Sequence, residues 1–415
     1  MPELFMKTDS ININSPVLQG GVYDWHQIPS LENLKKFIFL FLNFFKFSRG
    51  VRSHISIPAL KDGAIDPPAL FIHKLFRLGS INPLFVFLQG LALVILISSC
   101  AGDGSKSTQK KTTPTEKKTV IKVPDFNADS AYYFIEKQLS FGPRVPETEA
   151  HSQCAAWLVS TLERFATEVK VQEFKARIYD NRILNGKNII ASFKPEFQRR
   201  IFLSSHWDSR PYADHDADPS KHNTPIDGAN DGASGTGVLI EIARQISLQN
   251  PKIGVDIVLF DLEDYGPPQD NQTNQASETW GLGSQYWSNN PHTYGYSANY
   301  GILLDMVGAS DAVFPKEGFS MYYAPDIVEK VWGIAQSIGY ADYFLDETGG
   351  YITDDHYFVN TIAEIPTINI IHLDDNSVNG SFYDHWHTEK DNLEQIDPAT
   401  LKIVGQTVLT VIYRE

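Results

Sequence analysis

"VDIVLFDLED" at residues 255–264 decides the fold class of this 415-residue chain. Its first eight residues form an almost continuous apolar run, which is typical of a strand buried on both faces of a parallel sheet. Residues 300–307 (YGILLDMV) and 365–373 (IPTINIIHL) have the same pattern. We therefore expect these three segments to lie in the core of one sheet.

Shorter strand patterns and helical patterns alternate around these segments. A helix is expected over 234–249, where Val238, Ile242 and Ile246 fall on one stripe. Further strands are expected at 169–174, 188–193 and 201–205, and further helices within 129–165 and near 327–339 and 398–413. Strands that alternate with helices indicate an α/β domain. We predict a three-layer α/β/α domain over residues 123–415, with a central mixed, mostly parallel sheet.

Acidic residues and histidines follow the ends of the predicted strands or precede the next helix. They are His206, Asp208, Asp231, Glu263, Asp264 and Asp305. In open α/β sheets, that edge of the sheet is where ligands bind. Two later segments, TDDH at 353–356 and HWHTEKDN at 385–392, add more such residues, including His387.

This residue set is suited to a catalytic zinc ion, which takes about three protein ligands and keeps one open position. Asp231, Asp264 and His387 can supply two carboxylates and an imidazole. Glu263 lies beside a ligand and could act as a general base. Asp208 could orient the ring of His206. Crowded carboxylates are favourable around a cation and repel one another without it.

Each motif alone has an ordinary structural explanation. GANDGASG at 228–235 could be a turn that caps a helix, the DLED segment could be a solvated strand end, and DHWHT at 384–388 could be a surface turn. Their joint occurrence at strand ends favours a metal site. We expect the polar segment 212–223 to be a solvated loop at the rim of that site, and His372 to be a core residue.

Charge and cysteine content exclude several classes of protein. The formal net charge is −15, yet residues 1–99 carry nine Lys and Arg against six Asp and Glu, so the rest of the chain is strongly acidic. An acidic body argues against nucleic acid as a partner. The two cysteines, Cys100 and Cys154, are too few for a disulfide framework or a cysteine zinc site. We expect Cys154 to be buried on a helix.

Residues 83–100 (PLFVFLQGLALVILISSC) have the features of an export signal. Lys74 and Arg77 precede an apolar run that is too short to span a bilayer comfortably. The end, LISSC, resembles a bacterial lipobox, which implies that Cys100 is lipidated and anchors an exported, periplasm-facing or outer-membrane lipoprotein. The alternative is a buried helix that ends in cysteine.

The leader and the body are joined by a polar segment. Residues 101–122 are rich in Lys and Thr and lack aromatic residues, which indicates a flexible tether. We therefore divide the chain into a leader at 1–99, with the signal at about 74–99, a lipidated Cys100 with its tether at 100–122, and the catalytic domain at 123–415. Because export signals begin near the N-terminus, we expect translation to start shortly before Lys74, so that residues 1–69 precede the true start.

The ordered set of candidate ligands just described resembles that of the zinc-dependent aminopeptidase superfamily. Within it, five further motifs are similar to those of the glutaminyl-peptide cyclotransferases, also called glutaminyl cyclases. They are HWDSRP (206–211), GLGSQYW (281–287), LLDMVG (303–308), TDDHYF (353–358) and HWHTEKDN (385–392). The resemblance covers residues from about 125 to 415 and implies a zinc aminopeptidase-like fold.

The resemblance also implies a reaction and a set of roles. Glutaminyl cyclases convert an N-terminal glutamine to pyroglutamate with loss of ammonia, using one zinc that polarises the γ-carbonyl. The zinc ligands would be Asp231, Asp264 and His387. Glu263 would move a proton from the attacking amine to the leaving ammonia, supported by Asp305 and Asp355. Asp264 stands where many relatives have Glu, which shortens this ligand by one methylene.

Two other functions remain open. Aminopeptidases of the superfamily bind a second zinc through positions that match His206, Asp231 and Asp305, and they hydrolyse N-terminal residues with a metal-activated water. The aromatic residues Trp280 and Trp386 favour the cyclotransferase, because they would form a pocket for an uncharged amide side chain. The second alternative is a non-catalytic surface lipoprotein, and the presence of a general base beside the ligands argues against it.

Overall fold

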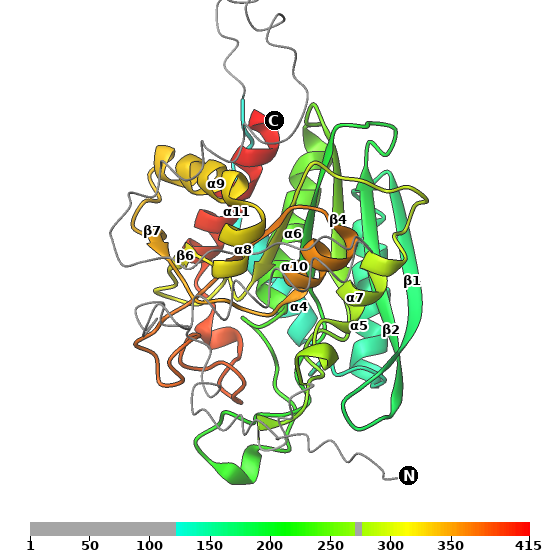
Figure 1. Cartoon of the computed structure of the whole chain (residues 1–415), viewed down its shortest axis with the longest axis vertical. Coiled ribbons are helices and arrows are strands. Elements are labelled where there is room, and N and C mark those ends of the chain that lie inside the picture. The colour runs from blue at the N-terminus through cyan, green and yellow to red at the C-terminus, as the bar shows by residue number, and fades with distance from the viewer. Residues whose placement is uncertain (1–121, 270–275) are drawn as a thin grey trace, which may run out of the picture. The chain divides into compact units, whose positions relative to one another are not determined.

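The structure is a computed structural model that describes residues 122–269 and 276–415 (Figure 1). The predicted leader, the lipidation site Cys100 and nearly all of the tether lie outside these residues. Within the described part of the chain, no helix is both long and apolar enough to cross a membrane.

A six-stranded mixed sheet forms the centre of the body. In order across the sheet, the strands are β1 (Glu168–Arg177), β2 (Ile183–Phe193), β4 (Gly254–Phe260), β3 (Arg200–His206), β5 (Gly301–Asp305) and β8 (Thr367–Ile371). β1 and β2 form an antiparallel hairpin, and β2 is antiparallel to β4. From β4 to β8 all neighbouring strands are parallel. The mixed, mostly parallel sheet predicted from the sequence is confirmed.

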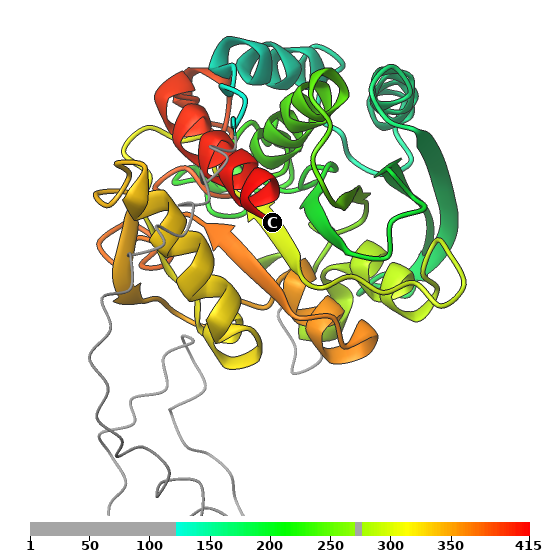
Figure 2. The same cartoon turned by 90° about the horizontal axis from the view of Figure 1, so that it is seen from above.

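Helices cover both faces of this sheet, as Figures 1 and 2 show. One face carries α4 (Ala128–Leu139), α5 (Glu149–Leu162), α6 (Ala233–Leu248) and α11 (Pro398–Arg414), and the other carries α7 (Leu282–Asn289) and α10 (Asp355–Phe358). Side chains of β4 alternate between the two: Ile257 and Leu259 join the cluster beneath α6, whereas Val258 and Phe260 pack with Trp287 of α7. This alternation explains why the strand is apolar on both faces.

Several short elements are absent from the sequence prediction. They are α7, α8 (Gly318–Tyr323), α10, the following π-helical turn Val359–Ala363, and a separate parallel pair β6 (Phe314–Lys316) and β7 (Phe344–Thr348). Each spans eight residues or fewer, which is too short to display a clear period. The longer predicted helices are confirmed, including the one near 327–339, which is α9 (Pro325–Ser337). Cys154 is buried on α5, as predicted.

The strand predicted over 255–262 ends earlier, at Phe260. Leu262 has a φ of 55°, in the left-handed region that non-glycine residues rarely adopt. The backbone therefore turns sharply before Glu263 instead of continuing the strand.

A close approach of α6 to the sheet fixes the position of the GANDGASG loop. A Cβ added to Gly235 would lie 2.3 Å from the carbonyl oxygen of Leu304 and 2.4 Å from Oγ of Ser205. Only glycine leaves room for this packing. The first turn of α6 is thereby held against β3 and β5, beside the strand ends that carry His206 and Asp305.

Candidate active site and metal centre

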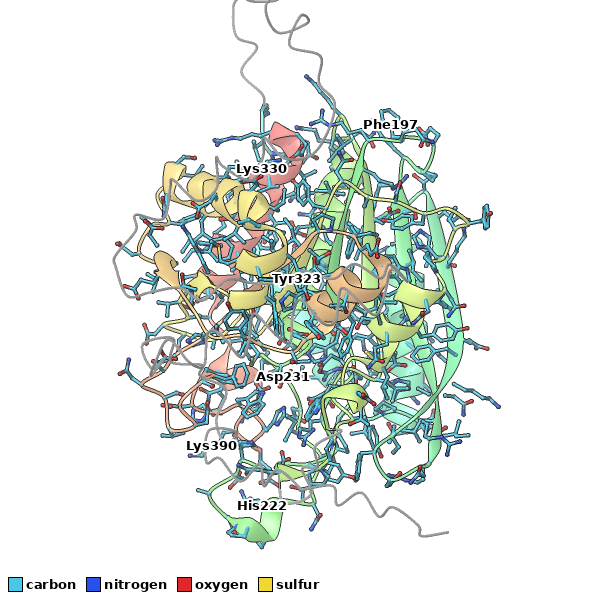
Figure 3. The ribbon with its side chains drawn as sticks, viewed as in Figure 1. Phe197, His222, Asp231, Tyr323, Lys330 and Lys390 are labelled. Carbon is cyan, nitrogen blue, oxygen red and sulfur yellow. The ribbon has the colours of Figure 1, made fainter. Side chains whose placement is uncertain are left out.

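The carboxyl ends of the parallel strands meet at one edge, and the predicted site residues gather there. His206 is the last residue of β3 and pairs with Phe260 at the end of β4, while Asp305 ends β5. Figure 3 places Asp231 toward the same end of the molecule as His222 and Lys390, away from Phe197 and Lys330. Residues from well-separated segments of the chain thus form one site.

Among the described residues, three groups of side chains have donor atoms close enough to share a metal ion. One of them, Asp214, His215 and His387, lies beside the cavity, and the other two share Asp231. Of these two, Asp231, Asp264 and His387 form one group, and His206, Asp231 and Asp305 form the other. Asp231 belongs to both, with its Oδ1 3.0 Å from Nε2 of His206 and its Oδ2 3.5 Å from Nε2 of His387. All five side chains of these two groups are buried.

The donor set around His387 fits zinc. Nε2 of His387 lies 3.2 Å from Oδ1 of Asp264, and the buried Oδ2 of Asp264 has no hydrogen-bond partner. A carboxylate oxygen left unsatisfied in a buried site is costly. One imidazole and two carboxylates match the ligand types and number of a catalytic zinc site.

Asp208 lies beside the ring of His206, the residue that it was predicted to orient, and it also makes two contacts that were not predicted. Its Oδ1 lies 3.5 Å from Nδ1 of His206. The same carboxylate accepts hydrogen bonds from the backbone N–H groups of Glu263 (3.2 Å) and Asp264 (3.3 Å). Asp208 therefore ties the end of β3 to the turn that carries the candidate base and one candidate ligand.

Glu263 lies in a buried, strongly acidic environment. Burial raises the pKa of its carboxyl well above the ordinary value, and the charges of Asp354 and Asp264 add to this, although the charge of His206 opposes it. A carboxyl whose pKa is raised in this way holds a proton more readily than an exposed one, which suits general acid–base catalysis.

The pKa of Asp305 is raised in the same way. Burial raises the pKa of Asp305 to about 7, with a contribution from the charge of Asp354 that a hydrogen bond with His206 partly offsets. Oδ1 of Asp305 lies 3.2 Å from Nε2 of His206. The strand-end carboxyl predicted to serve the reaction therefore lies within a hydrogen-bonded network at the site.

A cavity of about 300 Å³ opens onto these groups. Its lining residues are Asp231, Glu263, Asp264, Trp280, Asp305, Met306, Ile352, Thr353, Asp354, Ile371, Phe382, Trp386 and His387. Both predicted tryptophans are among them, with ring centres 6.2 Å (Trp280) and 3.8 Å (Trp386) from that of His387. The cavity joins an acidic floor to aromatic walls.

The prediction that Asp355 contributes to the reaction is not supported by its position. Asp355 is fully buried at the start of α10, whereas its neighbour Asp354 lines the cavity. Asp354 is held by the backbone N–H of Asp355 and the side-chain amide of Asn369. Two adjacent carboxylates in a sequence look equivalent, and only the start of a short helix decides which one faces the cavity.

His356 and His372 do not belong to the candidate metal groups. Nε2 of His356 lies 2.9 Å from the fully buried carboxylate of Glu317. This contact holds the TDDH segment against the interior of the domain. His372 is buried after β8, as predicted for a core residue.

The segment 212–223 is more than the solvated loop that we predicted. Its first part enters the site: the buried Asp214 lies 3.5 Å from Nδ1 of His387 and pairs with the buried Arg210. Only the later part, such as Asp218, is exposed. Alternating His and Asp residues are typical of both solvated and buried loops, so the sequence held no signal for this contact.

A further link also escaped the sequence analysis. Asp391, in the HWHTEKDN segment, accepts hydrogen bonds from the backbone N–H groups of Asn230 (2.8 Å) and Asp231 (3.1 Å). It thereby joins the loop that carries Asp231 to the segment that carries His387. His387 itself has a φ of 54°, a strained conformation of the kind that clusters at functional sites.

Comparison with known proteins identifies relatives with this architecture. The sequence profile of peptidase family M28 matches residues 188–412. The glutaminyl-peptide cyclotransferase of Drosophila melanogaster is 27% identical over 293 residues, covering 62% of this chain and 73% of that protein.

Solved structures of other proteins are also similar to this chain. The glutaminyl cyclase of Bacteroides thetaiotaomicron, bound to N-acetylhistamine, is 53% identical with a TM-score of 0.69, and the match covers 71% of this chain and 100% of that one. A protein from Parabacteroides distasonis described as a Zn-dependent exopeptidase is 54% identical, with the same TM-score and coverage. The chain is thus similar to proteins described by two different activities.

Proposed function

Because this chain belongs to peptidase family M28, we propose that it uses the zinc-binding site of that family to cyclise N-terminal glutamine, releasing ammonia from peptides and proteins. One observation carries the proposal: the cavity joins a buried glutamate and a zinc ligand set to two tryptophans, Trp280 and Trp386. Such walls suit a compact, uncharged carboxamide side chain.

The side chains have separate tasks in this reaction. Asp231, Asp264 and His387 would hold the zinc ion, which when bound would supply a Lewis acid for the side-chain carbonyl of the substrate. Glu263 accepts a proton from the α-amine as its nitrogen bonds to the side-chain carbonyl carbon. Glu263 then returns this proton to the departing nitrogen as the carbon–nitrogen bond of the carboxamide breaks. Ammonia leaves and no water is consumed.

Asp305 and Asp354 complete the acidic floor of the cavity. Their carboxyl groups can accept hydrogen bonds from the substrate amine and from the leaving ammonia. Asp354 takes the place in this role that the sequence analysis had given to Asp355.

We propose a single zinc ion. An N–H at Nε2 of His206 would satisfy Asp231 and Asp305 at 3.0 and 3.2 Å without a metal. Around His387, by contrast, Oδ2 of Asp264 has no partner. The carboxylates of the first group therefore face a hydrogen-bond donor, although Nδ1 of His206 has no hydrogen-bond partner, whereas a carboxylate oxygen of the second group is left without one. This difference favours a cation at the second group.

A two-zinc aminopeptidase is the second candidate function. The observation that favours it is the group His206, Asp231 and Asp305, whose donor atoms could hold a second metal beside the first. Glu263 would then activate a water molecule instead of a substrate amine.

One assay separates the two reactions. The purified chain is incubated with an N-terminal Gln dipeptide, while ammonia and the mass of the peptide are followed, and in parallel with leucine amide. Cyclisation without cleavage, lost on treatment with a chelator, is the expected result. Cleavage of leucine amide without cyclisation would assign the site to an aminopeptidase and contradict the proposed role of the tryptophans.

We also propose that the protein is an exported lipoprotein anchored through Cys100. The support is the order of Lys74 and Arg77, an apolar run and the LISSC sequence. Mass spectrometry of the N-terminal peptide from the native host tests this. A lipid-modified Cys100 at the mature N-terminus is expected, and an unmodified peptide that reads through Cys100 would refute the anchor.

A further inference from the structure

Arg210 is a buried cation next to one of the proposed zinc ligands. It follows β3 in the HWDSRP motif and is 1% exposed. Its Nη1 donates to the backbone carbonyl of Asp264 at 3.1 Å and lies 3.4 Å from Oδ1 of the same residue. A second nitrogen, Nη2, donates to the carbonyl of Pro267 at 3.2 Å. The guanidinium therefore holds both the backbone and the side chain of Asp264.

Asp214 extends this contact to a second proposed ligand. Nε and Nη2 of Arg210 donate to its two carboxylate oxygens, Nε at 2.8 Å. Oδ1 of Asp214 also lies 3.5 Å from Nδ1 of His387, the ring nitrogen that faces away from the metal group. Arg210 and Asp214 therefore form a buried, bidentate ion pair beside His387.

The same short segment contacts both aromatic walls. The guanidinium carbon of Arg210 lies 4.8 Å from the ring centre of Trp280. The ring of His215 lies 4.3 Å from that of Trp386, and its backbone N–H donates to the carbonyl of His387 at 3.1 Å. Residues 210–215 thus contact both the proposed metal ligands and the two tryptophans that line the cavity.

We propose that Arg210 and Asp214 form one positioning unit that sets the zinc affinity of this chain by fixing Asp264 and His387; the proposal rests on the proposed zinc site. At 3.5 Å from Nδ1 of His387, the carboxylate of Asp214 favours an N–H at that nitrogen, which leaves Nε2 free to bind a metal. The shorter side chain of Asp264 makes its backbone position important, and Arg210 holds that backbone directly. Because Asp214 neutralises the guanidinium, the cation beside the metal does not repel it.

The chain contains a matched control for this pair. Arg200 donates from Nε (2.7 Å) and Nη2 (2.9 Å) to the buried carboxylate of Asp256. These residues lie at the beginnings of β3 and β4, so the pair has the same chemistry and burial at the opposite end of the same strands. Breaking it should cost stability but should not reach the metal site.

The test compares Asp214→Asn with Asp256→Asn in the full chain, using zinc itself as the probe. Zinc affinity is measured by competition with a chromophoric chelator in the absence of substrate. We expect Asp214→Asn to weaken zinc binding by about 10–100-fold, the usual effect of removing a residue that orients metal ligands. Asp256→Asn should retain the affinity of the unsubstituted chain.

Unchanged zinc affinity in Asp214→Asn would overturn the proposal. An equal loss of affinity in Asp256→Asn would also overturn it, because it would show a general effect of breaking a buried ion pair. If Asp214→Asn does not fold, Arg210→Lys decides, with Arg200→Lys as its control. A lysine cannot donate to both oxygens of Asp214 and also reach Asp264, so zinc binding should weaken, and unchanged binding overturns the proposal. Because no substrate is present, these outcomes do not depend on whether cyclisation is observed.

Discussion

Glu263 is the residue on which the proposed reaction depends most directly. It lines the cavity, its pKa is raised by burial first and by neighbouring carboxylates, and its backbone is held by Asp208. The proposed reaction requires a side chain at position 263 that can exchange a proton. Folding should require only a side chain of the same size and polarity.

Glu263→Gln should therefore lower kcat for cyclisation by about 10²–10⁴-fold, the usual contribution of a general acid–base residue. Zinc content, measured by elemental analysis, should stay at the level of the unsubstituted chain. A variant that keeps its turnover, or that loses activity only because it loses zinc, would contradict the role of Glu263.

The adjacent pair Asp354 and Asp355 gives a prediction in which one residue is the control for the other. Burial first, and then the charge of Asp354, raises the pKa of Asp355 well above its ordinary value, and Asp355 does not line the cavity. Asp355→Asn should change kcat and KM little, whereas Asp354→Asn, on the cavity wall, should lower kcat by about tenfold or more. Steady-state kinetics on both variants decide, and an equal loss in Asp355→Asn would restore the role that the sequence suggested.

His372 makes the stability of the fold depend on pH. Burial lowers its pKa to about 4, although the charges of Asp374 and Asp384 oppose this. In the unfolded chain its pKa is about 6.5. Between these values the unfolded state binds a proton that the folded state does not, so stability is lost as pH falls through this window.

Urea unfolding at pH 7 and pH 5 measures this effect. About 2 kcal/mol of the difference between the two pH values should come from His372, at 1.36 kcal/mol per pKa unit. His372→Gln should reduce the difference by about that amount, whatever its effect at pH 7. An equal pH dependence in both proteins would show that His372 does not contribute.

At the scale of elements, the site depends on the contact of α6 with β3 and β5. Gly235 allows that contact, and an alanine there would place its Cβ 2.3 Å from a backbone oxygen. Gly333 in α9 is a suitable control, because an added Cβ meets nothing within 4 Å.

We expect Gly235→Ala to destabilise the fold by about 1–3 kcal/mol or more, the usual cost of overpacking. Gly333→Ala should instead stabilise it by roughly 0.5–1 kcal/mol, because alanine favours a helix interior. Denaturant unfolding of both variants tests the pair. Destabilisation of similar size in both would mean that the close packing of α6 is not the cause.

At the scale of the whole molecule, the zinc site joins distant parts of the chain. Asp231 precedes α6, Asp264 follows β4, and His387 follows β8 by sixteen residues. A ligand that binds only the folded state stabilises it by mass action, by about 2.7 kcal/mol at a free concentration of 100 times Kd. Bound zinc also relieves the repulsion among buried carboxylates.

Removal of zinc with a chelator should therefore lower the Tm by several degrees and abolish cyclisation. Addition of zinc in excess of the chelator should restore both, and magnesium, which prefers an octahedral shell of oxygen ligands, should restore neither. A Tm that is insensitive to the chelator, measured by differential scanning calorimetry, would contradict a zinc ion that bridges the fold.

The sequence by itself determined the fold class and most of the site. Continuous apolar strands such as 255–260 and the stripe on α6 are dictated by burial, which acts on each segment separately. Asp231, Asp264 and His387 could be selected because the ends of parallel strands must meet at one edge. Their chemistry, two carboxylates and an imidazole, is visible without coordinates.

Only the tertiary structure decided which neighbours surround these groups. The choice of Asp354 over Asp355, the link from Asp391 to Asp231, and the Arg210–Asp214 contact with His387 all join segments with no periodic pattern. Side-chain direction in turns depends on φ and ψ at single residues, such as Leu262, and on contacts that are formed only after the layers have packed. Such contacts are set by the sum of long-range packing, which no local pattern of residues encodes.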